Sequence, residues 1–253
     1  MNIKNYNFSG KSFNFLLEIE KDYKNPILIE EKILGEAEHG FAKYVGGIPI
    51  IELSITENYK KEVIIHEAYH LRLKFDGMPN IGFELPQGNL SEENRIYLEW
   101  FAHLYWDKIM HHFFYYKIKD NLNLDPYFAF KKELDIIFNK SEIKGLNSAT
   151  KELTLAGHYL QVWVETNDES YLKKFRDFLN DKYDSLGIEK GEYLIKIMKE
   201  NPLITFDDCI MLFKKIFDYL HLEQKIKISK ETLKSNTNKL FNENYVLFDI
   251  QTY

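Results

Sequence analysis

The sequence lacks several features that define common classes of protein. It contains a single cysteine, Cys209, so no disulfide can form within the chain, as is typical of a reducing compartment. The formal net charge is −6, whereas nucleic-acid binding requires a concentrated basic face. No apolar run is long enough to span a bilayer, and the first residues lack the apolar core of a signal peptide. We therefore expect a cytoplasmic protein with no membrane or nucleic-acid partner.

The composition predicts a folded protein with a substantial core. Of the 253 residues, 45% are hydrophobic and 15% are aromatic, so burial of apolar area can offset the chain entropy lost on folding. The first part of the chain mixes strand and helix patterns, and the part after Asp120 has helical spacing throughout. We predict an α+β fold with two domains, a mixed domain over residues 1–120 and a helical domain over residues 121–253.

The first domain is expected to contain a helix over residues 12–23, a short strand over residues 26–29 and a β-hairpin. Two β-type runs, residues 40–45 and 48–53, flank Gly46-Gly47, which is a hairpin signal. Pro49 lacks the N–H that a ladder requires, so we place the second hairpin strand at a sheet edge.

Helices are predicted on both sides of a loop that covers residues 75–90. Ser54 and Glu57 have the spacing of a capping box, which predicts a helix from about residue 55 to Lys74. A long aromatic helix is expected over residues 92–118. Five further helices are expected near residues 126–139, 148–166, 169–184, 188–200 and 205–222, before a strand or docked tail at residues 245–250.

The pattern His-Glu-x-x-His, at residues 66–70, is the strongest chemical signal in the chain. Residues four apart lie on one face of a helix, so His66 and His70 can share one zinc ion. Zinc lowers the pKa of its bound water, and Glu67 lies close enough to accept the proton and later deliver it to a leaving group. The alternative is a pair of surface histidines on an amphipathic helix.

A catalytic zinc ion usually takes three protein ligands, so a third must come from elsewhere in the chain. We favour Glu99, because a carboxylate in a helix rich in aromatics costs desolvation energy unless it is paired or bound to metal. His103, one turn later, is the alternative ligand or an orienting partner of the first. Glu92 and Glu93 are the third choice.

Other polar residues are weighed for supporting roles. Tyr69, Tyr97 and His158 are candidate donors to the oxyanion that forms during peptide hydrolysis, and spacing alone places none of them. His111 and His112 are adjacent and point to different faces, so a solvated or partner-facing role is favoured over metal binding.

The order of these motifs resembles the gluzincin class of metallopeptidases, and within it the ImmA/IrrE-like proteins. The resemblance covers residues 25–112. It begins with a strand that carries Gly47, Pro49, Ile51 and Leu53. The His66-Glu67-x-x-His70 helix follows, and after it the Glu99-Trp100-Phe101-Ala102-His103 segment. The resemblance implies a zincin-like domain in which His66, His70 and Glu99 bind Zn²⁺, Glu67 is the catalytic base and the edge strand aligns the substrate.

We therefore predict a zinc metallopeptidase that cleaves a peptide bond in a protein or peptide substrate. The resemblance implies regulatory proteolysis of one specific intracellular protein. A second hypothesis, from another functional class, is a catalytically inactive zincin-like module that binds or regulates a partner. A third is a helical protein without metal.

Overall fold

The computed structural model describes residues 3–34, 39–84, 92–122, 124–138, 143, 151–220, 225–232 and 244–251. Side chains are described over these ranges except at Asn80, residues 82–102, five positions of α4 and the strands after residue 220. The fold is α+β with helical content dominating, as predicted. The chain divides into two compact units, and helix α3 (Glu92–Lys117) contributes to both, with residues up to Phe113 in the second unit and those from Phe114 in the first.

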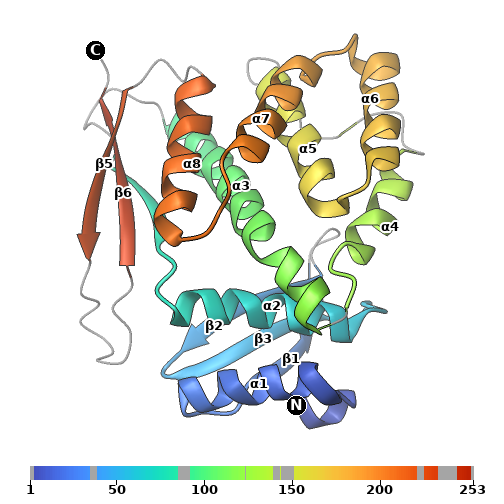
Figure 1. Cartoon of the computed structure of the whole chain (residues 1–253), viewed down its shortest axis with the longest axis vertical. Helices are drawn as coiled ribbons and strands as arrows, with labels where there is room; N and C mark the ends of the chain where they lie inside the picture. The colour runs from blue at the N-terminus through green and yellow to red at the C-terminus, as the bar shows by residue number, and fades with distance from the viewer. Residues whose placement is uncertain are drawn as a thin grey trace. The chain divides into compact units, whose positions relative to one another are not determined.

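The first unit is built on a three-stranded sheet with helices packed on it. Its elements are a short 3₁₀ helix η1 (Ile3–Tyr6), α1 (Gly10–Tyr23), β1 (Leu28–Lys32), β2 (Gly40–Val45), β3 (Ile48–Ser54), α2 (Lys60–Phe75), the end of α3 and the π-helical turn η2 (Ile118–Leu122). Helix α2 lies across β2 and β3 (Figure 1) and also contacts α1. The hydroxyl of Tyr23 in α1 donates a hydrogen bond to the carbonyl of Leu71 in α2, at 2.8 Å.

The predicted hairpin is confirmed, but the predicted position of its second strand is wrong. Gly46 and Gly47 both have positive φ, 58° and 93°, as the tight turn between β2 and β3 requires. Strand β3 is central, because it pairs in parallel with β1 and antiparallel with β2. Pro49 is tolerated because pairing with β1 begins one residue later, at Ile50. The edge position next to the hairpin turn therefore belongs to β2.

Helix α2 begins later than the capping-box pattern predicted. Ser54 remains in the sheet, where it pairs with Lys32 and its N–H bonds the carbonyl of His39, so it does not cap the helix. The Glu57 carboxylate instead accepts hydrogen bonds from the N–H of Tyr59 and from the His39 ring. The helix starts at Lys60.

Helix α2 is buried on more than one side. Its fully or nearly fully buried residues, which span several turns, include Val63, Ile64, Ile65, Ala68 and Leu71. A helix that is apolar around most of its circumference is buried by neighbours on several sides. Burial on several sides fixes the orientation of α2 and of the polar residues that it carries.

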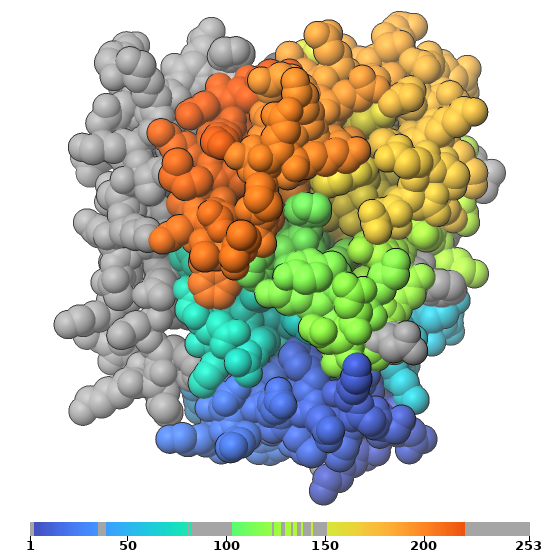
Figure 2. Space-filling model, in the orientation of Figure 1, coloured from blue at the N-terminus to red at the C-terminus, as the bar shows by residue number. Residues whose placement is uncertain are grey.

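The second unit is mainly helical. It contains the first part of α3, α4 (Phe128–Ile137), α5 (Lys151–Thr166), α6 (Glu169–Tyr183), α7 (Ile188–Glu200) and α8 (Phe206–Tyr219), which confirms the five predicted helices. Helix α5 contacts α4, α6 and α7, and the side chains of α7 and α8 lie side by side on the face shown in Figure 2. Cys209 is fully buried in α8.

A second small sheet lies in the same unit, and its strand β6 (Asn244–Gln251) confirms the strand that was one of the two alternatives predicted at residues 245–250. Strand β4 (Asn80–Glu84) falls within the predicted loop, and it forms a sheet of order β4-β6-β5 with β5 (Lys225–Thr232) and β6 (Asn244–Gln251). The two units therefore interleave along the sequence, whereas a single boundary at residue 120 was predicted. Among the described residues, no helix has both the length and the apolarity to cross a membrane.

Candidate metal centre

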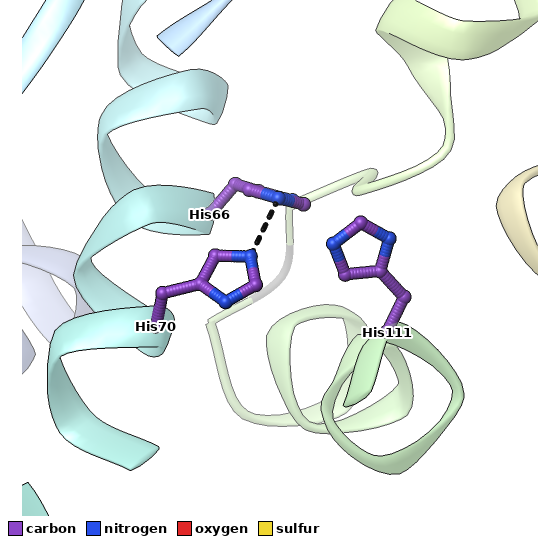
Figure 3. Close-up of side chains that lie close together, drawn as sticks. All are labelled: His66, His70 and His111. Carbon is purple, nitrogen blue, oxygen red and sulfur yellow. Dashed lines mark hydrogen bonds between the residues drawn. The ribbon is translucent and has the colours of Figure 1, made fainter. Parts of the chain in front are cut away.

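The His-Glu-x-x-His motif lies in the second and third turns of α2. The Nε2 atoms of His66 and His70 lie 3.2 Å apart, and one imidazole donates a hydrogen bond to the other (Figure 3). Both side chains are partly buried. The i, i+4 spacing thus brings two ring nitrogens together on one face of the helix, as the sequence predicted.

Aromatic rings from the end of α3 hold the two imidazoles in place. The His66 ring makes edge contacts with the rings of Phe114 and Tyr115, both at 5.5 Å between centroids. The His70 ring packs edge-on against Phe114 at 5.1 Å. Phe114 also stacks on Tyr69, the residue between the two histidines on the helix. These buried rings restrict the rotation of both imidazoles, so the two nitrogens are preorganised.

Glu67 lies beside the histidine pair, at a longer distance from His66 than the distance between the two histidines. Its Oε1 atom is 4.0 Å from Nε2 of His66, and the residue is 7% exposed. Strand β2 approaches this point closely at Gly40, where an added Cβ would lie 2.6 Å from Cγ1 of Val63 and 3.1 Å from Cγ of Glu67. The absence of a side chain at residue 40 therefore lets the start of β2 lie against the helical turn that carries Glu67.

We expect the Gly40→Ala substitution to destabilise the protein by about 1–3 kcal/mol, the usual cost of overpacking a closely packed site. The measurement is urea unfolding followed by circular dichroism. Adding Val63→Ala to Gly40→Ala removes the nearest contact, so the double variant should lose less stability than the two single losses added together. Additive losses would show that Gly40 does not limit the approach of β2 to α2.

His111, in the second unit, is the third member of a group of residues that could hold a metal ion with His66 and His70. Helix α3 is continuous, and His111 lies one turn before Tyr115 on the same face of it. One side-chain nitrogen of each of these three residues lies within 4.8 Å of the other two, and Figure 3 draws the three rings. His111 is only 6% exposed, so of the two roles predicted for it, solvated or partner-facing, the solvated one is wrong.

A buried charge network surrounds His111 in the second unit. Its Nδ1 atom lies 2.6 Å from Oε1 of Glu165 in α5, and the same oxygen accepts a hydrogen bond from Nζ of Lys108 at 2.6 Å. Lys108 also donates to Asp107, whose other oxygen lies 3.3 Å from Nε2 of His111. Burial raises the pKa of the Glu165 carboxyl, but the opposing charges and hydrogen bonds of His111 and Lys108 hold it well below its usual range.

The same network explains why a second group of possible metal ligands is a poor metal site. Asp107, His111 and Glu165 also lie close enough together to hold an ion. The Lys108 ammonium, however, already lies between the two carboxylates. Burial lowers the pKa of Lys108, but the charges of Asp107 and Glu165 raise it above its ordinary value overall, so Lys108 stays protonated and neutralises the pair.

Replacement of Lys108 by methionine is expected to cost about 3–5 kcal/mol of stability, because it removes one partner of a buried ion pair. The measurement is chemical unfolding of the wild type and the variant. The double variant Lys108→Met/Glu165→Leu removes both charges and should recover most of the loss. A double variant no more stable than Lys108→Met would show that the charge pair is not what the substitution disrupts.

The remaining candidates from the sequence lie outside the described side chains or outside the metal-compatible groups. Glu99, the predicted ligand, lies in α3, and its side chain falls outside the described residues, as does that of Tyr97. His103 is exposed and belongs to neither metal-compatible group among the described side chains. Glu92 and Glu93 open α3, and their side chains also fall outside the described part.

The two described candidates for an oxyanion donor are engaged elsewhere. The Tyr69 ring stacks against Phe15 and Phe114, and burial raises the pKa of its hydroxyl to about 12. In α5, the Nδ1 atom of His158 lies 3.2 Å from the side-chain oxygen of Gln161. Neither arrangement assigns a catalytic role.

The histidine pair fits the coordination chemistry of zinc. Tetrahedral zinc with Zn–N distances of about 2.0–2.1 Å separates two ligand nitrogens by about 3.3 Å. The observed separation of 3.2 Å is close to this value. The structure thus contains groups of His, Asp and Glu side chains that could hold a metal ion, and the donors of the first group are all imidazole nitrogens.

Comparison of the chain with family models, curated proteins and solved structures found no match.

Proposed function

We propose that this protein is a zinc-dependent peptidase whose metal is held by His66 and His70 and whose general base is Glu67. The observation that carries the proposal is the 3.2 Å separation of the two Nε2 atoms, with a carboxylate beside them. The resemblance of the motif order to gluzincins supports it. The identity of the metal rests on the donor set, because imidazole nitrogens suit zinc better than they suit calcium or magnesium.

Zinc, when bound, supplies a Lewis acid that polarises a peptide carbonyl and makes water a better nucleophile. Glu67 accepts a proton from the attacking water as the water oxygen forms its bond to the carbonyl carbon. The same carboxyl then delivers the proton to the amide nitrogen as the C–N bond breaks, which leaves a carboxylate and an amine. At 4.0 Å from Nε2 of His66, Glu67 lies further away than a ligand sharing the metal with that nitrogen, and this distance suits a base rather than a ligand.

The sheet suggests where an extended substrate pairs. Strand β3, the predicted substrate strand, has β1 on one side and β2 on the other, so a peptide cannot add to it. Strand β2 is the outer strand next to it, and its Gly40 end lies against the turn that carries Glu67. We propose that an extended peptide pairs with β2, where main-chain hydrogen bonds align it without strong dependence on sequence. A single specific protein as substrate rests on the resemblance alone.

The proposal is tested by mapping new protein N-termini in a lysate of the source cells. The lysate is incubated with zinc-loaded protein, with chelator-treated protein and with chelator-treated protein to which zinc is returned. We expect one or a few new termini that disappear with chelation and return with zinc. Zinc binding without any metal-dependent terminus would favour the inactive binding module instead.

A further inference from the structure

We propose that Phe41 and Val45 select the substrate, so that the peptide paired with β2 carries apolar side chains at two positions four residues apart. This assignment rests on the proposed function, because it supposes that an extended peptide pairs with β2 and is cleaved beside Glu67. The class of substrate is an extended segment with one apolar residue close to the scissile bond and a second further along the same side of it.

The side chains of β2 alternate between two faces of the sheet. At Gly40, an added Cβ would meet Val63 and Glu67 of α2. At Tyr44, the ring lies 5.3 Å from the ring of Tyr23 in α1, measured between centroids. The even-numbered residues of β2 therefore face the two helices, and the odd-numbered residues face the opposite side of the sheet.

The odd-numbered face of β2 exposes two large apolar side chains. Phe41 is 58% exposed and Val45 is 54% exposed, although both lie within a strand. Among the strands that the structure describes, β2 is the outer strand beside β3, and an outer strand with exposed apolar side chains pairs readily with another chain. Because β2 begins beside Glu67, such a chain runs past the proposed catalytic carboxylate, which favours a substrate over a second copy of the protein.

The lysine between these two residues does not demand a charged partner. Lys43 donates a hydrogen bond to Glu52 on β3, which also accepts one from Lys32. Lys32 in turn lies 2.9 Å from Glu30, so two lysines and two glutamates form a set without net charge. The hydrogen bonds from Lys32 and Lys43 hold the pKa of Glu52 below its usual value, so its carboxylate stays ionised at neutral pH. A face with balanced charges matches an uncharged partner better than a charged one.

The register of a paired peptide follows from the geometry of a sheet. A peptide beside β2 places every second side chain on the exposed face, so the residues opposite Phe41 and Val45 are four apart. Apolar side chains at these two positions cover exposed apolar surface. The residue opposite Gly40 lies next to the turn that carries Glu67, where cleavage is proposed. Because Phe41 and Val45 both follow Gly40, both apolar positions fall on one side of the scissile bond, whichever direction the peptide runs.

Cleavage-site profiling of a peptide library tests the assignment. The zinc-loaded full chain is incubated with peptides prepared from a denatured proteome, and the new termini are identified by mass spectrometry. We expect leucine, isoleucine, valine and phenylalanine to be enriched by about 1.5–5-fold at two positions four apart on one side of the scissile bond, the size of a cross-strand apolar pair.

Two variants change this preference at one position each. Phe41→Thr removes apolar surface and should abolish the enrichment at the nearer position, while the farther position keeps it. Val45→Lys adds a charge and should replace apolar residues by aspartate and glutamate at the farther position, a gain of preference that a misfolded protein cannot imitate. Ile33→Thr is the matched control, because Ile33 is 86% exposed just beyond β1, the other outer strand, and this variant should keep the wild-type preference.

The outcomes separate this assignment from the proposed function. A wild type that cleaves no library peptide in a zinc-dependent manner would overturn both. Zinc-dependent cleavage with the same profile in the wild type, Phe41→Thr and Val45→Lys would overturn the assignment and keep the peptidase. A wild-type dimer in solution that Val45→Lys converts to a monomer would also overturn the assignment, because a second copy would then cover β2.

Discussion

The His70→Ala variant is expected to lose at least about 100-fold in zinc affinity, a larger effect than the 10–100-fold typical of a lost orienting partner. The reason is geometric. The Nε2 atoms of His66 and His70 are already at the spacing of two zinc ligands, so most of the ordering cost is met in the folded protein. The measurement is metal content by elemental analysis after dialysis against a zinc buffer, with one equivalent expected in the wild type.

Two controls define this result. His158→Ala removes another partly buried histidine, in α5, and should leave the zinc content unchanged. Circular dichroism of His70→Ala checks that α2 is still folded, because the ring also packs on Phe114. A folded His70→Ala variant that keeps one zinc per chain would place the metal elsewhere and leave the motif as a hydrogen-bonded pair of histidines.

The second large effect is expected from Glu67→Gln, which should lower the rate of peptide hydrolysis by about 10²–10⁴-fold while the chain keeps its zinc. Glutamine has nearly the same shape as glutamate, so the contact between Gly40 and the helix is preserved. It cannot accept the proton from water. The loss should therefore appear in kcat and leave zinc content unchanged.

This variant is measured on the substrate found by mapping new N-termini, or on a peptide that spans its cleavage site. Glu62→Gln, which alters a carboxylate in the first turn of the same helix, is the matched control and should retain activity. Equal rates for Glu67→Gln and the wild type would remove Glu67 as the base. Loss of zinc in Glu67→Gln would instead indicate that Glu67 is a ligand.

Much of the fold was predictable because it depends on local sequence. The Gly46-Gly47 turn and the five helices of the second unit were predicted from turn chemistry and helical periodicity, which act over a few residues. The start of α2 was not predicted correctly. Ser54 has the residue type and spacing of a cap, but its pairing with Lys32 keeps it in the sheet, and that pairing joins residues distant in sequence.

The order of the strands also depends on pairing between residues that are distant in sequence. Pro49 forbids a ladder bond at one position only, and the start of the β1 pairing at Ile50 avoids that position. The sequence shows that Pro49 cannot donate a ladder hydrogen bond, but it does not show that the pairing with β1 begins at the next residue. This strand order matters for the proposed function, because it places the peptide-binding edge at β2 and not at β3.

For the site, the sequence by itself determined the part that one helix can build. The spacing of His66 and His70 places two nitrogens on one face, and Glu67 lies beside them. Only the tertiary structure decided the surroundings of His111. Its burial depends on Glu165, 54 positions later and on another helix. A carboxylate within the apolar run of α5 was a signal of a buried partner, but helix periodicity cannot name that partner. Local geometry follows from bonds and rotamers, whereas the burial of His111 depends on how helices pack.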